Sequence, residues 1–305
     1  MFSPKLNTTI IKLFSFLSVI RGYNILVLII AQYLAAIFIF SPSKTLRNTL
    51  FDLHLLYIIL ATICVVASGY LINDFYDAKL DKINRPLKAR IDNYVRQSTK
   101  LRLYFLLNFF GVVFGLLISV KAALFFAIYI FAIWSYSHKL KKYPLLGILS
   151  ATMLTILPFF AVFVYFKNFS SIIFMHAFFL FLVIMIRELL KDLQSMKGAI
   201  VHNYDTFPIV YGEKNTKLVC LLLLILTVFP IVILFSFPAL SYMRYYFYVA
   251  LMVFFFLGIY LWKSSELKHY RMMHNVLKIL LLIGVFSIIF IDTSMLVEKV
   301  IDRLH

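Results

Sequence analysis

Three acidic residues and an asparagine stand close together directly after a long apolar run. The segment 73–81 reads Asn-Asp-Phe-Tyr-Asp-Ala-Lys-Leu-Asp, and it holds three of the chain's 13 acidic residues. If the preceding helix continues through it, Asn73, Asp77 and Asp81 lie within an arc of about 80°, and Asp74 falls beside Asp81. Clustered carboxylates repel one another and are costly next to hydrocarbon, so we expect a bound cation. Oxygen ligands of this kind favour Mg²⁺, which binds one or two carboxylates together with substrate phosphates.

A second acidic segment follows a later apolar run. Glu188 and Asp192 are four residues apart, so on a helix they share a face. An even number of membrane crossings separates them from the first segment, so both acidic faces are expected at the same membrane boundary, where they would hold one or two Mg²⁺. The basic residues expected on that side, where they would neutralise phosphate charge, are Arg85, Lys88, Lys139, Lys141, Lys142 and Lys191.

The composition predicts the elements that position these residues. Of the 305 residues, 63% are hydrophobic, and the charged residues, only 14%, are gathered between apolar runs. This pattern is typical of a polytopic α-helical membrane protein. The net charge of +17 does not indicate a nucleic-acid partner, because the basic residues flank the apolar runs, where they set membrane topology.

Nine apolar segments have a length suited to spanning a bilayer. They are approximately Tyr23–Phe40, Leu55–Ile72, Leu103–Val120, Ala122–Tyr136, Leu145–Phe166, Ile172–Ile186, Leu218–Phe235, Tyr245–Leu261 and Val276–Ile291. No linker or change in composition separates them, so residues 1–305 are expected to form a single transmembrane domain. We therefore predict an all-α fold of nine transmembrane helices.

The distribution of Lys and Arg predicts the orientation. With the N-terminus cytoplasmic, most of the 30 basic residues fall on the cytoplasmic side, as expected from the positive-inside rule. Both acidic segments then lie at the cytoplasmic boundary. We expect a multi-pass protein of the cell inner membrane with its active site on the cytoplasmic side.

At the two acidic segments the sequence resembles the UbiA-type membrane prenyltransferase family. The family's first motif, Asn/Asp-xxx-Asp-xxx-Asp, is matched by Asn73, Asp77 and Asp81, and residues 84–86 continue it as Asn-Arg-Pro. Its second motif, an Asp-rich helix end, is similar to residues 188–192. Further matches are Arg21, Asn24, Tyr136, Ser137, Leu140, Lys141, Thr206, Pro208 and Gly212.

The resemblance implies nine transmembrane helices around a central cavity, in which Mg²⁺ binds an isoprenyl diphosphate and the prenyl group passes to a lipophilic acceptor. It implies that Asp77, Asp81 and Lys141 are catalytic. The metal ligands it implies are Asn73, Asp74, Asp77, Asp81, Glu188 and Asp192. The substrate-binding residues it implies are Arg21, Asn24, Asn73, Arg85, Lys88, Tyr136, Lys139 and Lys191.

The chain also departs from the family pattern. Ser195 and Ala199 stand where relatives linked to ether-lipid synthesis carry further acids, in Lys-Asp-x-x-Asp-x-x-Gly-Asp, so the second metal site is poorer in carboxylates. Residues 187–192, Arg-Glu-Leu-Leu-Lys-Asp, are most similar to geranylgeranylglycerol-phosphate geranylgeranyltransferases. Those enzymes attach a second chain to a glycerol-phosphate lipid.

Simpler interpretations and other functions stay open at this point. The first acidic segment can be a solvated helix end paired with Lys79 and Lys82, and Glu188 and Asp192 can merely pair with Arg187 and Lys191. Lys141 can serve only to set topology, and Arg21 only to anchor a helix. An aromatic quinone precursor is an alternative acceptor. A transporter is a further alternative, although transporters usually place charges near the middle of the membrane.

Overall fold

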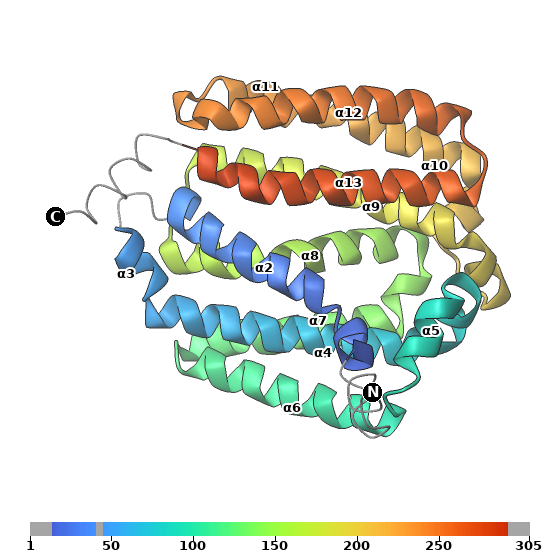
Figure 1. Ribbon diagram of the computed structural model, residues 1–305, viewed down its shortest axis with the longest axis horizontal. Coiled ribbons are helices and arrows are strands. Elements are labelled where there is room, and N and C mark those ends of the chain that lie inside the picture. Colours follow the sequence, from blue (N-terminus) through green and yellow to red (C-terminus); the bar gives the residue numbers. More distant parts are fainter. Residues whose placement is uncertain (1–13, 41–44, 292–305) are drawn as a thin grey trace, which may run out of the picture.

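The computed structural model describes residues 14–40 and 45–291, and all the regular structure in those residues is helical. The elements are α2 (Gly22–Ala35), η1 (Ala36–Phe40), α3 (Leu46–Leu50), α4 (Leu53–Asn84), α5 (Pro86–Asp92), α6 (Gln97–Leu116), α7 (Val120–His138), η2 (Leu140–Lys142), α8 (Pro144–Phe166), α9 (Ser171–Val201), α10 (Phe207–Leu226), α11 (Val228–Phe235), η3 (Pro238–Met243), α12 (Arg244–Lys263), α13 (Leu267–Ser287) and η4 (Ile288–Phe290). The long helices lie side by side, with α6 at one edge, α11 and α12 at the other, and α5 at one end (Figure 1). We call the end that carries α5 the polar end.

Nine helical segments in the described part of the chain are long and apolar enough to cross a bilayer. This confirms the prediction of a polytopic all-α membrane protein. The largest shifts in a boundary are at the ends of the sixth and second segments, which reach Val201 rather than Ile186 and Asn84 rather than Ile72; the seventh segment begins at Phe207 rather than Leu218. Pro208 fits the first turn of that helix, where its missing N–H costs nothing, and Gly212 bends the chain with a φ of 83°.

Two helices are much longer than the roughly 20 residues that a bilayer requires. Helix α4 has 32 residues and α9 has 31, so each is about 46–48 Å long. Their apolar halves account for the spanning length, and their remaining turns carry the two acidic segments. The expectation that the helix continues through residues 73–81 is therefore confirmed.

The two long helices organise two hydrophobic clusters. Helix α4 packs against α6 and α7, with Val65 and Leu71 in the first cluster, whereas α9 packs against α10 and α13, with Val183 in the second. Close approach of α6 and α7 depends on a glycine, because a Cβ on Gly115 would lie 2.8 Å from the Cα of Ala123. Small residues at such crossings are typical of membrane helix packing.

A proline inside α8 is accommodated by hydrogen bonds from neighbouring helices. Pro158 has no N–H to donate, which leaves the carbonyl of Leu154 without its helical partner. The hydroxyl of Tyr129 donates to that carbonyl at 2.9 Å, and the side-chain amide of Gln32 donates to the carbonyl of Pro158 at 2.9 Å. Backbone groups left unpaired in hydrocarbon are costly, so these two bonds fix α7 and α2 against α8.

Candidate active site

The first acidic segment meets a lysine that comes from the turn between α7 and α8. Lys141, in η2, places its Nζ 2.5 Å from Oδ1 of Asp77 and 3.4 Å from Oδ1 of Asn73. The Lys141 side chain is only 7% exposed. Burial lowers the pKa of the Lys141 amine and the nearby Asp77 carboxylate opposes that effect. One ammonium group is thus held between two oxygens of the acidic face of α4.

A second set of charges lies one turn further along α4. Asp81 interacts electrostatically with Arg85, Asp77, Lys88 and Arg21. Burial lowers the pKa of the Arg85 guanidinium, Arg21 lowers it further, and Asp81 counteracts both. Arg85 and Arg21, 64 residues apart in the sequence, therefore both act electrostatically on the Asp81 carboxylate.

Arg21 reaches this position through an unusual backbone conformation. It directly precedes α2 with a φ of 52°, in the left-handed region that non-glycine residues rarely adopt. Its guanidinium lies 4.9 Å from the ring centroid of Tyr70 on α4. Such a conformation costs free energy and persists only where the surroundings enforce it, so it supports a functional role for Arg21. Asn24, one turn later, is half-buried on the same helix.

Asp74 points away from this group, toward α6 and α5. Its Oδ2 lies 2.7 Å from Nζ of Lys100, a residue that is 1% exposed, and its Oδ1 lies 3.7 Å from Nζ of Lys88. Lys88 also contacts the buried Asp92, which accepts a hydrogen bond from Ser18 at 2.8 Å. Asp74 thus belongs to a buried network of charges, and its role as a metal ligand stays a prediction from the sequence.

The second acidic segment is partly neutralised within its own helix. Glu188 is buried and contacts Lys191 one turn later on α9. Tyr136, at the end of α7, interacts electrostatically with Lys191, Glu188 and Asp192 and also with Asp77 on α4. Tyr136 therefore lies within electrostatic range of both acidic segments, at the end of the molecule where the parity of the crossings predicts that they meet.

The polar ends of α4 and α9 are joined directly. The side chain of Asn84 accepts a hydrogen bond from the Gly198 N–H at 3.1 Å and donates to the Ser195 carbonyl at 3.4 Å. A Cβ on Gly198 would lie 2.4 Å from Asn84 Nδ2, so this contact requires glycine. Ser195 donates through its hydroxyl to the Lys191 carbonyl at 2.8 Å, and Ala199 is buried. The two positions that lack acids thus lie beside the helix junction.

The structure adds a residue that the sequence interpretation missed. Tyr204 lies in the turn before α10; burial and the charge of Asp77 raise its pKa to about 12. The Lys142 ammonium lies 5.5 Å from its ring centroid. No local pattern marks this loop tyrosine, because only the fold brings it to α4. Lys139, expected to bind substrate, is exposed.

The donor set suits a hard divalent cation. Within residues 14–40 and 45–291, no three His, Cys, Asp or Glu side chains form a ready cluster, and Asp74, Asp77 and Glu188 each form an ion pair with a lysine. Yet Asn73 and Asp77 already direct two oxygens at one cation, the Lys141 ammonium, which stands where a metal ion would meet them. Oxygen donors from carboxylate and amide groups fit Mg²⁺.

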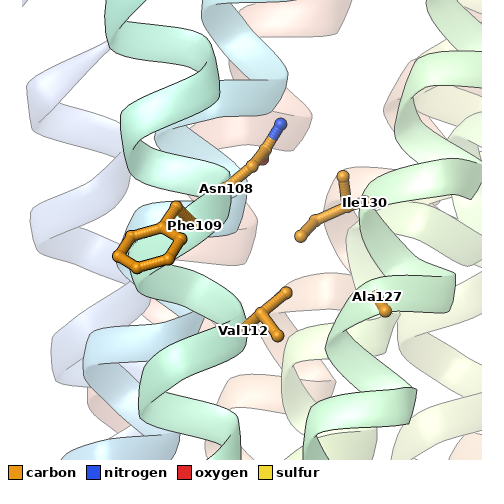
Figure 2. A pocket seen from close by; sticks show the side chains of 5 residues that line it. All are labelled: Asn108, Phe109, Val112, Ala127 and Ile130. Atoms are coloured by element: carbon orange, nitrogen blue, oxygen red, sulfur yellow. The ribbon is translucent and has the colours of Figure 1, made fainter.

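A groove between α6 and α7 offers no comparable chemistry. Figure 2 shows it lined by Phe109, Val112, Ala127 and Ile130, with Asn108 as its single polar side chain. The side-chain oxygen of Asn108 already accepts a hydrogen bond from Ser68 at 2.5 Å. The charged groups at the polar ends of α4 and α9 are therefore the candidate active site.

Nine helical segments of spanning length in the described residues, with two acidic segments joined at one end, define a polytopic membrane protein with a charged site at one boundary. The model of the family described as the UbiA prenyltransferase family matches residues 25–282. The chain belongs to the UbiA prenyltransferase family and is a membrane prenyltransferase.

Similar proteins agree with this assignment. The digeranylgeranylglyceryl phosphate synthase of Methanobrevibacter smithii is 30% identical over 220 residues, which cover 69% of this chain and 74% of the relative. A solved digeranylgeranylglyceryl phosphate synthase structure covers 91% of this chain and 97% of its own, with a TM-score of 0.66 and 22% identity. A UbiA homologue from Archaeoglobus fulgidus, bound to GPP and Mg²⁺, covers 90% and 99%, with a TM-score of 0.66 and 13% identity. These structures confirm the predicted fold.

Proposed function

We propose that this chain transfers an isoprenyl group from a polyprenyl diphosphate to the hydroxyl of a glycerol-phosphate ether lipid, in a Mg²⁺-dependent reaction. The observation that carries the proposal is the convergence of Asn73 and Asp77 on one buried cation, with Asp81 one turn away. The names of the similar synthases favour the glycerol-phosphate acceptor. Asn73, Asp77 and Asp81 would hold Mg²⁺, with Asp192 facing them from α9.

The reaction breaks the bond between the allylic carbon and the diphosphate oxygen and forms a bond from that carbon to the acceptor oxygen, whose proton passes to the released diphosphate or to water. Mg²⁺, when bound, supplies Lewis-acid stabilisation of the leaving diphosphate. Lys141 pairs with Asp77 here. When a metal ion neutralises that carboxylate, the Lys141 ammonium would be free to pair with a phosphate oxygen instead. Arg85, beside Asp81, provides a second cation for the leaving group.

We infer that the polar end faces the cytoplasm, with the N-terminus on the same side. The support is the concentration of Lys and Arg in the segments that connect the spans at this end. A cysteine-accessibility experiment tests the orientation. Replacement of the exposed Lys139 by Cys should give a thiol that a membrane-impermeant reagent labels in inverted vesicles and not in intact cells.

The activity is tested with purified protein in detergent micelles or nanodiscs. Labelled geranylgeranyl diphosphate, Mg²⁺ and a prenylglyceryl phosphate acceptor should give a diprenylated lipid, and EDTA should stop the reaction. A parallel reaction with 4-hydroxybenzoate tests the aromatic alternative. Product from the aromatic acceptor alone, or product formed at an undiminished rate in EDTA, would overturn the proposal.

A further inference from the structure

Helix α5 buries an ion pair and exposes large apolar side chains. Lys88 and Asp92 contact each other on its inner side, where Asp92 is 3% exposed and Ala89 is also buried. Leu87 and Ile91, on the other side, are 75% and 45% exposed. Successive residues of a helix turn by about 100°, so the two sets lie on opposite faces. A helix that meets only water shows the reverse arrangement, so the exposed side of α5 indicates contact with something apolar.

Basic side chains border these apolar residues. Arg90 is on the same side of α5, Tyr94 follows in the next turn, and Arg96 directly precedes α6; all three are exposed. We call Leu87, Arg90, Ile91, Tyr94 and Arg96 the outer face of α5. Within the part of the chain that the structure describes, neither arginine forms an ion pair. The outer face thus combines apolar area with two positive charges, which is the composition expected where a protein meets an anionic lipid surface.

Two contacts hold α5 near the level at which the hydrocarbon core ends. The Lys88 ammonium lies 3.7 Å from Asp74, which is two residues, or about 3 Å, beyond the last residue of the apolar run in α4, Ile72. The Ser15 hydroxyl donates to the Ile91 carbonyl at 2.6 Å, and Ser15 is helical and precedes the start of α2 by seven residues, or about 10 Å. The head-group layer on each side of a bilayer is about 5–8 Å thick. Helix α5 therefore lies at or close to the depth of the lipid head groups.

Other occupants match the outer face less well than lipid does. A second copy would bring together two chains that each carry a net charge of +17, and like charges repel. The first 13 residues contain two lysines and no acidic residue, so they would not neutralise the arginines. The lipid-facing surface, by contrast, continues directly from the outer face, because α6 begins after Arg96 and carries the exposed Phe105 and Phe109.

We propose that the outer face of α5 docks on the bilayer surface and binds the head groups of anionic phospholipids. Its apolar side chains enter the boundary between head groups and acyl chains, and its two arginines pair with lipid phosphates. Arg85 directly precedes α5, and Lys88 reaches Asp74 from the inner side, so the lipid contact fixes a segment that borders the candidate active site. The contact is with bulk phospholipid and involves neither substrate, so it is independent of the proposed function.

Quenching of a fluorophore by lipid tests this contact in the full chain. Leu87→Cys, labelled with bimane, is placed in nanodiscs of phosphatidylcholine with about 30% phosphatidylglycerol, in which one lipid at a time carries brominated acyl chains. Per lipid molecule, brominated phosphatidylglycerol should quench about fivefold more than brominated phosphatidylcholine, because a basic side chain near the surface favours anionic lipid by about that factor. Added NaCl at about 0.5 M should reduce this preference.

Two controls define the signal. Lys197→Cys is exposed on the additional turns of α9, about 16 Å beyond Ile186 at the end of the apolar run, so its bimane should be quenched by neither lipid. The unsubstituted chain, which carries the free cysteines Cys64 and Cys220, gives the background of labelling. Tyr94→Cys repeats the measurement at a second position of the outer face, so a local effect of replacing Leu87 does not decide the result.

A double variant, Arg90→Gln with Arg96→Gln, tests the charges in the labelled Leu87→Cys chain. It should bring the preference for phosphatidylglycerol below about twofold and leave quenching by phosphatidylcholine in place, because the apolar side chains remain. Lys214→Gln with Lys263→Gln removes the same charge from exposed positions on α10 and α12 and should keep the fivefold preference.

The possible results separate lipid from the other occupants. A bimane at position 87 that neither lipid quenches would overturn the docking on lipid. If dissolved iodide also failed to quench it, the outer face would be covered by protein instead, either a partner, a second copy or the chain's own first residues. Equal quenching by both lipids, or a preference for phosphatidylglycerol that survives in the double arginine variant, would overturn the assignment to anionic head groups.

Discussion

The two acidic segments occupy equivalent places at the polar ends of α4 and α9, yet they are built differently. On α4, Asn73 and Asp77 converge on a lysine from another element, and Asp81 continues the same face. On α9, Glu188 contacts Lys191 of its own helix, and Ser195 and Ala199 supply no carboxylate. The first segment is open to exchange its cation, since Lys141 reaches it from a turn, whereas Glu188 is neutralised locally.

This difference suggests a division of labour between the two helices. Helices α4 and α9 are both longer than a bilayer requires, and each has acidic side chains in its additional turns. Their ends are joined where Asn84 meets Gly198. Only α4 places several oxygens toward a shared cation. We infer that α4 carries the tightly held metal and that α9 contributes Asp192 and the rigid contact that keeps the two faces together.

Removing one carboxylate from each helix tests the difference between α4 and α9 most directly. Asp77→Asn should lower the rate of prenyl transfer by about 10³-fold or more, because metal stabilisation of the leaving group is worth several kcal/mol. Asp192→Asn should lower it by about tenfold at most. Initial rates with labelled geranylgeranyl diphosphate at saturating Mg²⁺ measure both. Equal losses in the two variants would contradict the assignment of the main metal site to α4.

A second prediction concerns the buried network that includes Asp74. Lys100→Met should lower the free energy of unfolding by about 3 kcal/mol, because it leaves the Asp74 carboxylate with only the more distant Lys88 as a partner. The double variant Asp74→Asn, Lys100→Met should recover most of that loss, since neither charge is then left alone. Thermal unfolding in detergent measures both.

Activity provides the control for this network. If Asp74 is structural, the stabilised double variant should keep a Mg²⁺ concentration for half-maximal activity within about threefold of the wild type, given that its metal ligands are unchanged. A shift of tenfold or more would support Asp74 as a metal ligand.

A third prediction tests the junction between the helices. Gly198→Ala should destabilise the protein by about 1–3 kcal/mol, because the new Cβ would lie 2.4 Å from the Asn84 side chain and overpack the contact. Gly258→Ala is the matched control on α12, where the Cβ would meet only Leu221 at an ordinary distance of 3.4 Å. Thermal unfolding of the two variants should differ clearly. Equal midpoints would show that the junction does not hold α4 and α9 together.

The sequence was sufficient to predict the spanning helices of the described residues and the placement of both acidic segments at one end of the bundle, because the length of each apolar run and the number of crossings can be counted along the chain. The approach of Lys141 to Asp77 agrees with that reasoning. The direction taken by Asp74 does not follow from helical periodicity, because it depends on the buried Lys100, which approaches from α6 and looks like an ordinary topogenic lysine in the sequence. Tyr204 is likewise placed by a turn whose path no local pattern encodes.

The last prediction attempts to make the second segment resemble the first. Asp192 and position 195 are three residues apart on α9 and share a face, so Ser195→Asp adds a carboxylate beside Asp192. The Ser195 carbonyl that accepts from Asn84 is unaffected, and only the bonds from the Ser195 hydroxyl to the carbonyls of Lys191 and Asp192 are lost. We expect the Mg²⁺ concentration for half-maximal activity to fall about threefold, since hard cations bind more tightly as carboxylates are added.

Gln194→Asp is the matched control for this variant, because it adds the same charge on α9 about 160° away from the face of Asp192. A general electrostatic effect would lower the Mg²⁺ requirement equally in both variants, and screening by 0.5 M NaCl would then abolish it. A change confined to Ser195→Asp that persists in salt requires direct coordination from α9. In that case the weakness of the second segment lies in its missing carboxylate rather than in the position of its helix.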